Sequence, residues 1–572
     1  MQRRLALLSV LAALPFLLLE PAPAEACGGT FCDSGPNSMP VDQTGENVLF
    51  VIDDTHVEAH IQIQYDPDAD ADKFAWVIPM QVLPEFSVGS DRLFQNLLSG
   101  TVPTYGYNTI SQPCGDEGDP SGDGDPTGDG DGDPDTGDGD GDGGPDVIFQ
   151  DVVGAFEIAV LQGGTIAEVM QWLGDNGYQQ DPNAEPVLDQ YLQEGFLFVA
   201  LKLAMNTEVA EIHPIVLRYQ GNEPCVPLRL TRIAAVEDMD VRVFMLGNAR
   251  SVPSNYRHVL VNPLKLDWFN NASNYKEVIS MAVDAQEANG NAFVTEYAGP
   301  SGVVPSWTIF QEQWNATPFE AFVDSPVGVI EELENQGLLN CDTEWDVNCT
   351  FNHPLLEGIL NNLIPVPEGV DANLFYDCLS CYQDQIDLDV WSAPLFASML
   401  EERMFAPAKQ AVALLNDNPY LTRMYTTISP SEMNDDPIFR INASLDDVPN
   451  IRFANQITHC DGSASVVLPD GREVLFPDGN NLTWPDFGDE MPWEEDVDQE
   501  AMADNAPLVN LVDNTEEIDK LLAAHNTQSK AKISGLGTGG CTCSIDEQDT
   551  RGGLALGLAT LALLGLVRRR RS

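Results

Sequence analysis

One stretch of the chain cannot take part in a packed core. Residues 115–146 contain only Gly, Asp, Pro, Ser, Thr and a single Glu. Ordering such a stretch costs conformational entropy, and no apolar side chain is present whose burial would offset that cost. We therefore expect a disordered Asp/Gly linker that interrupts one folded unit, whose two parts are 27–114 and 147–299. The linker could bind Ca²⁺ or another divalent cation weakly, but it lacks the apolar positions of β-roll repeats and the bidentate Glu of an EF-hand, so we expect no cofactor.

The charge of the whole chain excludes one class of partner. Asp and Glu number 90 against 27 Lys and Arg, which gives a net charge of −63 at pH 7. The linker holds thirteen of these acids, so the folded parts are acidic as well. This charge repels a phosphate backbone, and we expect no nucleic-acid partner. A hydrophobic fraction of 43% is nevertheless enough for real cores, and 572 residues correspond to roughly three or four folded units.

An N-terminal signal peptide is predicted at 1–26. Two arginines precede an apolar run at 5–19, and Ala-Glu-Ala at 24–26 fits the small-x-small rule for signal peptidase. Cleavage there would leave Cys27 as the first residue, as in a lipoprotein, but the preceding Ala-Glu differs from the Leu-small-small sequence that lipoprotein processing prefers. We therefore expect ordinary export into an oxidising compartment.

A membrane segment is predicted at 551–572. Its sixteen uncharged residues would span about 24 Å as a helix, somewhat less than the ~30 Å hydrocarbon core, and four arginines follow them. We expect a hydrophobic helix that halts translocation, with the arginines on the cytoplasmic side. The Gly-rich stretch before it, 533–550, contains Cys541 and Cys543. Together these features resemble the myxobacterial C-terminal sorting signal (MYXO-CTERM), which implies cleavage near the two cysteines by a sorting protease. A plain single-pass anchor is the alternative.

The residues between these ends favour an α+β fold with a β-rich, sandwich-like N-terminal unit. Apolar and polar residues alternate over 57–65, which is typical of a half-buried strand. Thr165 and Glu168 form a capping-box pattern that predicts a helix to about Leu173. Further strands are predicted at 48–52, 74–79, 156–161, 196–203, 212–219, 228–234 and 241–246.

The rest of the chain divides into two regions. The period of the apolar residues changes from Ser273 onward, and we expect a more helical region over 300–425, with helices near 326–339 and 393–415. A smaller β-containing region is predicted at 426–532. Its clearest element is a hairpin over 466–476, because Pro-Asp-Gly supplies turn residues between two apolar stretches.

Six short motifs follow one another in the first half of the chain. They are CGGTFC at 27–32, PVDQTGE at 40–46, FAWVIP at 74–79, GFLFVALKL at 195–203, PLRL at 227–230 and TEYAG at 295–299. In this order they resemble the bacterial domain-of-unknown-function 2330 family. The resemblance covers 27–299 apart from the linker, and it implies an exported bacterial protein with no established activity.

The cysteines predict disulfides. Cys27 and Cys32 enclose two glycines, so the backbone can turn back tightly enough to join them, and we expect Cys341 to pair with Cys349 in the same way. A metal or redox role is the alternative for the first pair, and a hard cation in the acidic loop is the alternative for the second. The connectivity of the other ectodomain cysteines stays open, although two of them have the C-x-x-C spacing of thiol oxidoreductases and of half a zinc site. These are Cys114, Cys225, Cys378, Cys381 and Cys460.

One metal site is a candidate. His56, Glu58 and His60 alternate along the predicted strand, so all three side chains point to one face and could reach a single cation. A polar, solvated strand face is the alternative, because no further ligand can be named.

No catalytic motif is present. The sequence lacks G-x-S-x-G, G-x-x-x-x-G-K-[ST] and H-E-x-x-H. We therefore predict a non-enzymatic envelope protein that binds an unknown surface ligand, held in the inner membrane as a precursor and then placed at the cell surface, in the outer membrane or outside the cell. The alternative is a secreted hydrolase or metal-dependent enzyme whose site forms only in the fold.

Overall fold

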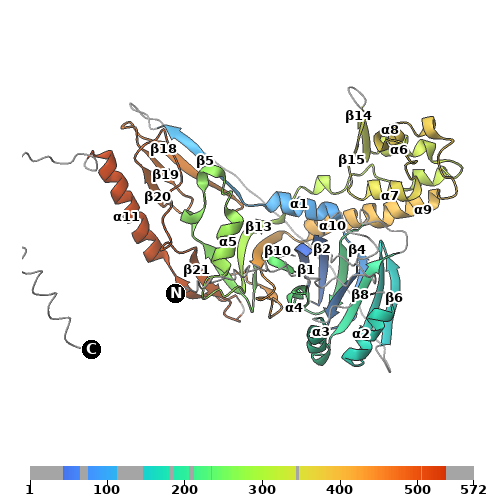
Figure 1. Ribbon diagram of the computed structural model, residues 1–572, viewed down its shortest axis with the longest axis horizontal. Coiled ribbons are helices and arrows are strands. Elements are labelled where there is room, and N and C mark those ends of the chain that lie inside the picture. The colour runs from blue at the N-terminus through green and yellow to red at the C-terminus, as the bar shows by residue number, and fades with distance from the viewer. Residues whose placement is uncertain are drawn as a thin grey trace, which may run out of the picture.

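The computed structural model describes 43–53, 55–64, 75–111, 146–176, 178, 184–204, 212–233, 235–342, 347–503 and 505–535 (Figure 1). The predictions on the signal peptide, on Cys27 and Cys32, on the linker up to residue 145, on Cys541 and Cys543, and on 551–572 lie outside these residues. Within the described part, no helix combines the length and the apolar character needed to cross a membrane.

A ten-stranded sheet runs through the molecule (Figure 1). The central strands β10 and β1 are parallel, and most of the other neighbouring pairs are antiparallel. In spatial order the strands are β22 (Val509–Asp513), β21 (Glu494–Gln499), β12 (Arg257–Val261), β13 (Ala292–Pro300), β16 (Tyr420–Ile428), β10 (Ala235–Gly247), β1 (Gln43–Ile52), β2 (His56–Gln64), β9 (Ile215–Gln220) and β4 (Glu85–Val88).

A second sheet packs against one face of β1, β2, β9 and β10. Its order is β3 (Ala75–Met80), β8 (Leu197–Leu203), β7 (Phe156–Gln162) and β6 (Asp146–Val153). Alternate residues of both sheets form the core between them, for example Val57 and Ile61 on β2 against Val199 and Leu201 on β8. The predicted α+β fold with a sandwich-like unit is therefore confirmed.

Two helices cover the outer face of the second sheet. They are α2 (Ile166–Asp175) and α3 (Ala184–Gln193), and they pack on outward residues such as Phe198. The capping box that the sequence predicts is present: the backbone N–H of Glu168 donates to the Thr165 hydroxyl, and the Glu168 carboxylate accepts from the Thr165 backbone.

One predicted strand is wrong. Residues 228–234 include α4 (Leu228–Thr231), a single helical turn that begins directly after Pro227. A short apolar run fits a buried turn of helix as well as a strand, so periodicity alone does not separate the two.

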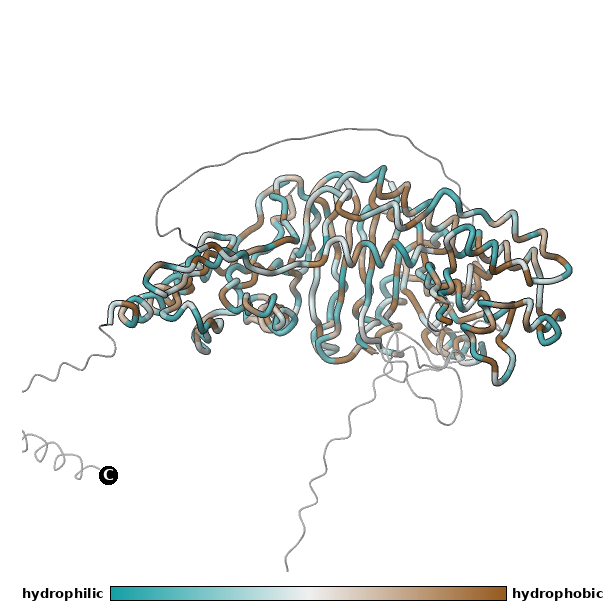
Figure 2. The backbone as a smooth tube through the Cα atoms, turned by 90° about the horizontal axis from the view of Figure 1, so that it is seen from above, coloured by the Kyte–Doolittle hydropathy of each residue, from teal (hydrophilic) through white to brown (hydrophobic). Residues whose placement is uncertain are grey.

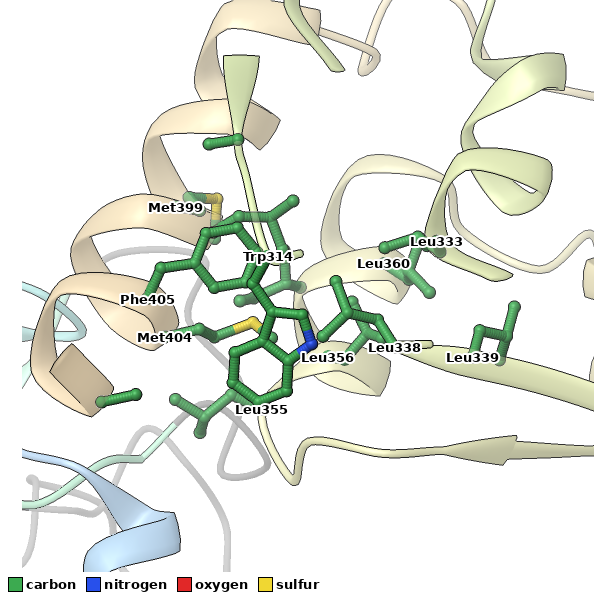
Figure 3. Packing of buried hydrophobic residues seen from close by; sticks show 14 of the residues in the cluster. Trp314, Leu333, Leu338, Leu339, Leu355, Leu356, Leu360, Met399, Met404 and Phe405 are labelled. Carbon is green, nitrogen blue, oxygen red and sulfur yellow. The ribbon is translucent and has the colours of Figure 1, made fainter. Parts of the chain in front are cut away.

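The middle of the chain is helical, as predicted, and covers the opposite face of β1 and β10, where Leu49 and Phe244 are buried. In its core Trp314 stacks on Phe405 with ring centroids 5.7 Å apart, and leucines surround both rings (Figure 3). Its elements, together with the earlier helix α1 (Asp91–Thr101), are α6 (Val329–Asn335), β14 (Leu339–Asp342), β15 (Asn348–Phe351), α7 (Leu356–Leu363), α8 (Ala372–Asp377), α9 (Ala393–Leu400) and α10 (Ala406–Asp417).

A third sheet forms the opposite end of an elongated molecule (Figures 1 and 2). The predicted hairpin is present as β19 and β20, with Gly471 at a φ of 90° in the turn, where a side chain would be strained. The elements of this end are β5 (Thr104–Ser111), β18 (Ile451–Thr458), β19 (Ala464–Val467), β20 (Glu473–Phe476), α5 (Tyr275–Val283) and α11 (Thr515–Ile533). A separate two-stranded ladder joins β11 (Ser251–Pro253) to β17 (Phe439–Ile441).

Candidate ligand-binding cavity

A cavity of about 550 Å³ lies between the two sheets of the sandwich. Most of its wall is formed by apolar side chains from both sheets, including Phe50, Ala59 and Leu217 from the large sheet and Ile78 and Met80 from β3, and the buried acid Glu46 of β1 also lines it. Ala59 stands between Val57 and Ile61 on the inward face of β2, and its short side chain leaves space in the core at that point. This volume falls within the roughly 300–1,000 Å³ that is usual for small-molecule sites.

Four polar side chains line one side of the opening of this cavity, which we call its mouth. Arg229 on α4 donates from Nε to Asp436 Oδ2 at 2.9 Å, and from its two terminal nitrogens to the Glu194 carboxylate at 2.8 Å each. The Tyr191 hydroxyl donates to the same Asp436 oxygen at 2.7 Å, and the guanidinium lies 4.1 Å from the centre of the Tyr191 ring. We call Tyr191, Glu194, Arg229 and Asp436 the mouth cluster. It joins α3, α4 and the segment before β17.

The positive charge of Arg229 is compensated within the mouth cluster. The hydrogen bonds that Arg229 donates to Glu194, together with the charge of Asp436, raise the pKa of Arg229 even though burial opposes this. The same bonds lower the pKa of Glu194. Burial raises the pKa of Tyr191, and the neighbouring Asp436 raises it further, so the phenol keeps its proton. Arg229 is thus fully engaged by two carboxylates and offers no free charge to an anionic ligand.

Cys225 is the one free cysteine among the described residues, and it also lines the cavity. Burial raises the pKa of its thiol, and the nearby Asp436 carboxylate adds to the shift. A protonated thiol is a poor nucleophile, and no histidine is among the described lining residues to act as a base.

The other amide and acid side chains of the lining are Glu46, Gln81, Gln220, Asn222, Glu223, Asn255 and Asp435. The amides can make hydrogen bonds with a neutral ligand, whereas the acids repel an anion. The arrangement is therefore suited to a hydrophobic molecule without a negative charge.

The three residues predicted to bind metal lie elsewhere, on the opposite face of β2 from Ala59. His60 is buried and its Nε2 lies 2.8 Å from Glu58 Oε1, which also accepts from Gln410 of α10. His56 instead contacts the Thr55 hydroxyl through Nδ1 at 2.8 Å. No group of three or more His, Cys, Asp or Glu side chains in the described ranges is placed to hold a metal, so the predicted metal triad is not formed. The residue of α10 that meets Glu58 is a glutamine, Gln410, and not a further ligand.

Two cysteine pairs that lie wholly within the described residues form disulfides. Cys341 and Cys349 are directly opposite each other in the β14–β15 ladder and are joined, and so are Cys378 and Cys381 between α8 and the turn that follows it. The C-x-x-C pair is therefore a disulfide in this structure. Cys460 is also disulfide-bonded.

The sequence analysis missed the mouth cluster. Arg229 and Asp436 are 207 positions apart, and no spacing rule connects them. Mistaking α4 for a strand also hid the position of Arg229. The nearest available signal was the arginine of the PLRL motif itself.

The fold and the cavity define a β-sandwich protein with a ligand-sized space between its sheets. The chain belongs to a family described as "Uncharacterized protein conserved in bacteria (DUF2330)", whose model matches residues 21–306. No curated protein and no solved structure matches the chain.

Proposed function

We propose that this chain is an exported, non-enzymatic protein of the bacterial envelope that holds a neutral hydrophobic molecule between its two sheets. The observation that carries the proposal is the 550 Å³ cavity, whose walls are predominantly apolar and whose one arginine among the described lining residues is already paired with two carboxylates. A concave, predominantly apolar pocket of this size with a few polar groups is the usual setting for a small-molecule site.

Two further observations support the proposal. Four of the motifs that resemble the family contribute lining residues: PVDQTGE provides Glu46, FAWVIP provides Ile78 and Pro79, GFLFVALKL provides Phe196, and PLRL provides Arg229. Export is supported by the predicted signal peptide and by disulfides, which persist in oxidising compartments. Placement at the cell surface after cleavage by a sorting protease, with the membrane holding the precursor, belongs to the same proposal.

A fluorescence titration with N-phenyl-1-naphthylamine, a neutral hydrophobic probe, tests the cavity. We expect saturable binding to the wild-type chain and several-fold weaker binding to Ala59→Leu, because the added carbons occupy space that the probe needs. The larger side chain enters a void, so Ala59→Leu should keep the wild-type unfolding free energy or raise it.

The matched control is Ala200→Leu, which enlarges an alanine on β8 that is fully buried in the core beneath α2 and α3. This change should overpack that core and cost about 1–3 kcal/mol of unfolding free energy while leaving probe affinity unchanged. Equal probe affinity in Ala59→Leu and wild type, or no saturable binding to wild type, would refute the proposal.

A further inference from the structure

A second cavity, of about 400 Å³, lies at the other end of the molecule. It is enclosed by β12, β13 and β21 of the large sheet and by β5 and β18 of the third sheet. Trp268, Leu266 and Val261 are among its apolar walls. Its chemistry differs from that of the first cavity, because its two lining arginines, Arg250 and Arg452, form no ion pair with a carboxylate among the described residues.

The first unusual group is a buried arginine. Arg250 is 8% exposed, and it donates to the backbone carbonyl of Asp446 at 2.9 Å and to the Thr295 hydroxyl at 3.2 Å. Its remaining contact is His258 Nε2 at 3.1 Å. Because arginine can only donate, Nε2 must accept, and the proton of the neutral imidazole therefore resides on Nδ1. Burial, together with the arginine, lowers the pKa of His258 to about 3, which keeps this ring neutral.

Around Arg250 and His258, the cavity has more hydrogen-bond donors than acceptors. Arg250 Nε and His258 Nδ1 are both buried with no hydrogen-bond partner among the described residues. A second guanidinium, Arg452, lines the same cavity and donates to the Tyr105 hydroxyl at 2.7 Å and to two backbone carbonyls. Neither arginine has a carboxylate within 4.0 Å in the part of the chain that is described. In a protein with 90 Asp and Glu for 27 Lys and Arg, two arginines without a carboxylate partner in one cavity indicate a place for an external anion.

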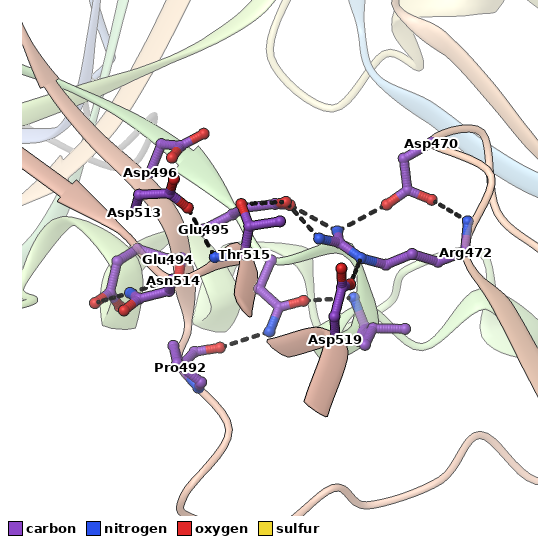
Figure 4. A network of polar contacts seen from close by, with 12 residues as sticks. Asp470, Arg472, Pro492, Glu494, Glu495, Asp496, Asp513, Asn514, Thr515 and Asp519 are labelled. Atoms are coloured by element: carbon purple, nitrogen blue, oxygen red, sulfur yellow. Dashed lines mark hydrogen bonds and ion pairs between the residues drawn. The ribbon is translucent and has the colours of Figure 1, made fainter. Parts of the chain in front are cut away.

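The strand next to β12 carries two carboxylates that form no ion pair within 4.0 Å among the described residues. On β21, Asp498 lies across from His258 and Asp496 across from Leu260, and both carboxylates accept from the same amide, Asn510. Burial raises the pKa of both aspartates, although the charge of Arg250 acts to lower the pKa of Asp498. The nearby Arg472 does not neutralise them, because it is held by Asp470, Glu495 and Asp519 (Figure 4).

From these contacts we infer that the second cavity binds a zwitterionic molecule with an apolar body, of the class of aromatic amino acids or short apolar peptides. The ligand carboxylate meets Arg250 and Arg452, its ammonium group meets Asp496 and Asp498, and its side chain lies along Trp268 and Leu266. A simple anion would leave the two aspartates unpaired and be repelled by them, and a simple cation would leave the two arginines unpaired.

Isothermal titration of the folded chain with three compounds that share one phenyl group tests this inference. The compounds are L-phenylalanine, 3-phenylpropanoate, which lacks the ammonium group, and phenethylamine, which lacks the carboxylate. We expect L-phenylalanine to bind roughly tenfold or more tighter than either analogue, since each analogue leaves a charged wall unpaired.

Asp498→Asn should remove most of this preference. We expect this substitution to lower the affinity for L-phenylalanine roughly tenfold and to leave the affinity for 3-phenylpropanoate unchanged or higher. The matched control, Asp519→Asn, removes the same charge from α11 outside the cavity and should change neither affinity. Arg250→Gln should abolish binding of both carboxylates, with circular dichroism as the check on folding; if that variant does not fold, the Asp498→Asn result decides. Equal affinity of wild type for L-phenylalanine and 3-phenylpropanoate, or no binding of any of the three at millimolar concentration, overturns the inference.

Discussion

At the scale of single residues, the first cavity depends on how buried charges are compensated. The Asp436 side chain is 9% exposed and receives the Arg229 backbone N–H, the Arg229 guanidinium and the Tyr191 hydroxyl. Burial raises the pKa of Asp436, and these three donors oppose that rise. A charge in this position is stable only while its partners are present.

Asp436→Asn tests this dependence. The amide has no charge to pair with Arg229, which would keep only the more exposed Glu194, so we expect a loss of about 2–4 kcal/mol in unfolding free energy, measured by urea denaturation. Glu194→Gln is the control: that carboxylate is 46% exposed, and its loss should cost less than about 1 kcal/mol. Similar losses in both variants would show that burial does not govern the cluster.

Asp91, the first residue of α1, gives a pH-dependent prediction. Burial raises its pKa to about 7 despite a weak hydrogen bond from Gln62, and its Oδ2 is shielded from solvent without a partner among the described residues. In the unfolded chain the group ionises near pH 4, so between about pH 4 and 7 unfolding releases a proton and rising pH destabilises the fold. The stabilisation that the raised pKa of Asp91 contributes to the fold is fully present below about pH 4 and is lost above about pH 7.

Asp91→Asn removes this titration. The variant should be more stable than wild type by about 1–3 kcal/mol at pH 8 and show little difference at pH 4, as measured by urea unfolding at both values. Glu185→Gln, at an exposed first-turn acid of α3, should not show a pH-dependent difference of this size. A wild-type chain that gains stability from pH 4 to 8 relative to Asp91→Asn would contradict the assignment.

At the scale of elements, the sequence correctly predicted those helices and strands whose formation depends mainly on nearby residues. The alternation at 57–65 became β2, and the capping box became α2, because both depend on neighbouring residues alone. The strand predicted at 228–234 failed because the choice there depends on Pro227 and on packing against residues far along the chain. The candidate site shares this limit, since its polar residues come from α3, α4 and the segment before β17.

The capping box offers a test at this scale. Thr165→Ala removes the hydroxyl that accepts the Glu168 N–H, and we expect it to cost about 0.5–2 kcal/mol by thermal or urea unfolding. Thr527→Ala is the matched control, because its hydroxyl bonds back to the Ala523 carbonyl within α11, where alanine favours the helix. An equal loss at both positions would mean that the cap contributes nothing specific.

At the scale of the whole molecule, the ten-stranded sheet joins strands from regions that the sequence analysis predicts as separate. β16 lies between β13 and β10, and β21 and β22 extend the sheet from near the end of the described chain. The two strands that flank the linker, β5 and β6, belong to different sheets. Such pairings are non-local, and hydrophobic periodicity identifies a strand without naming its neighbour. The sequence therefore supports the fold class but does not define the continuous sheet or either cavity.

The most direct test of the proposed function is to locate a neutral hydrophobic ligand in a crystal of the folded chain. Crystals soaked in 1-bromonaphthalene should show an anomalous bromine peak between the two sheets, in van der Waals contact with Ala59, Met80 and Leu217. The peak should disappear in Ala59→Leu crystals. Density for ordered water alone in the wild-type cavity, or bromine found only at other sites, would contradict the proposal that this space holds a hydrophobic ligand.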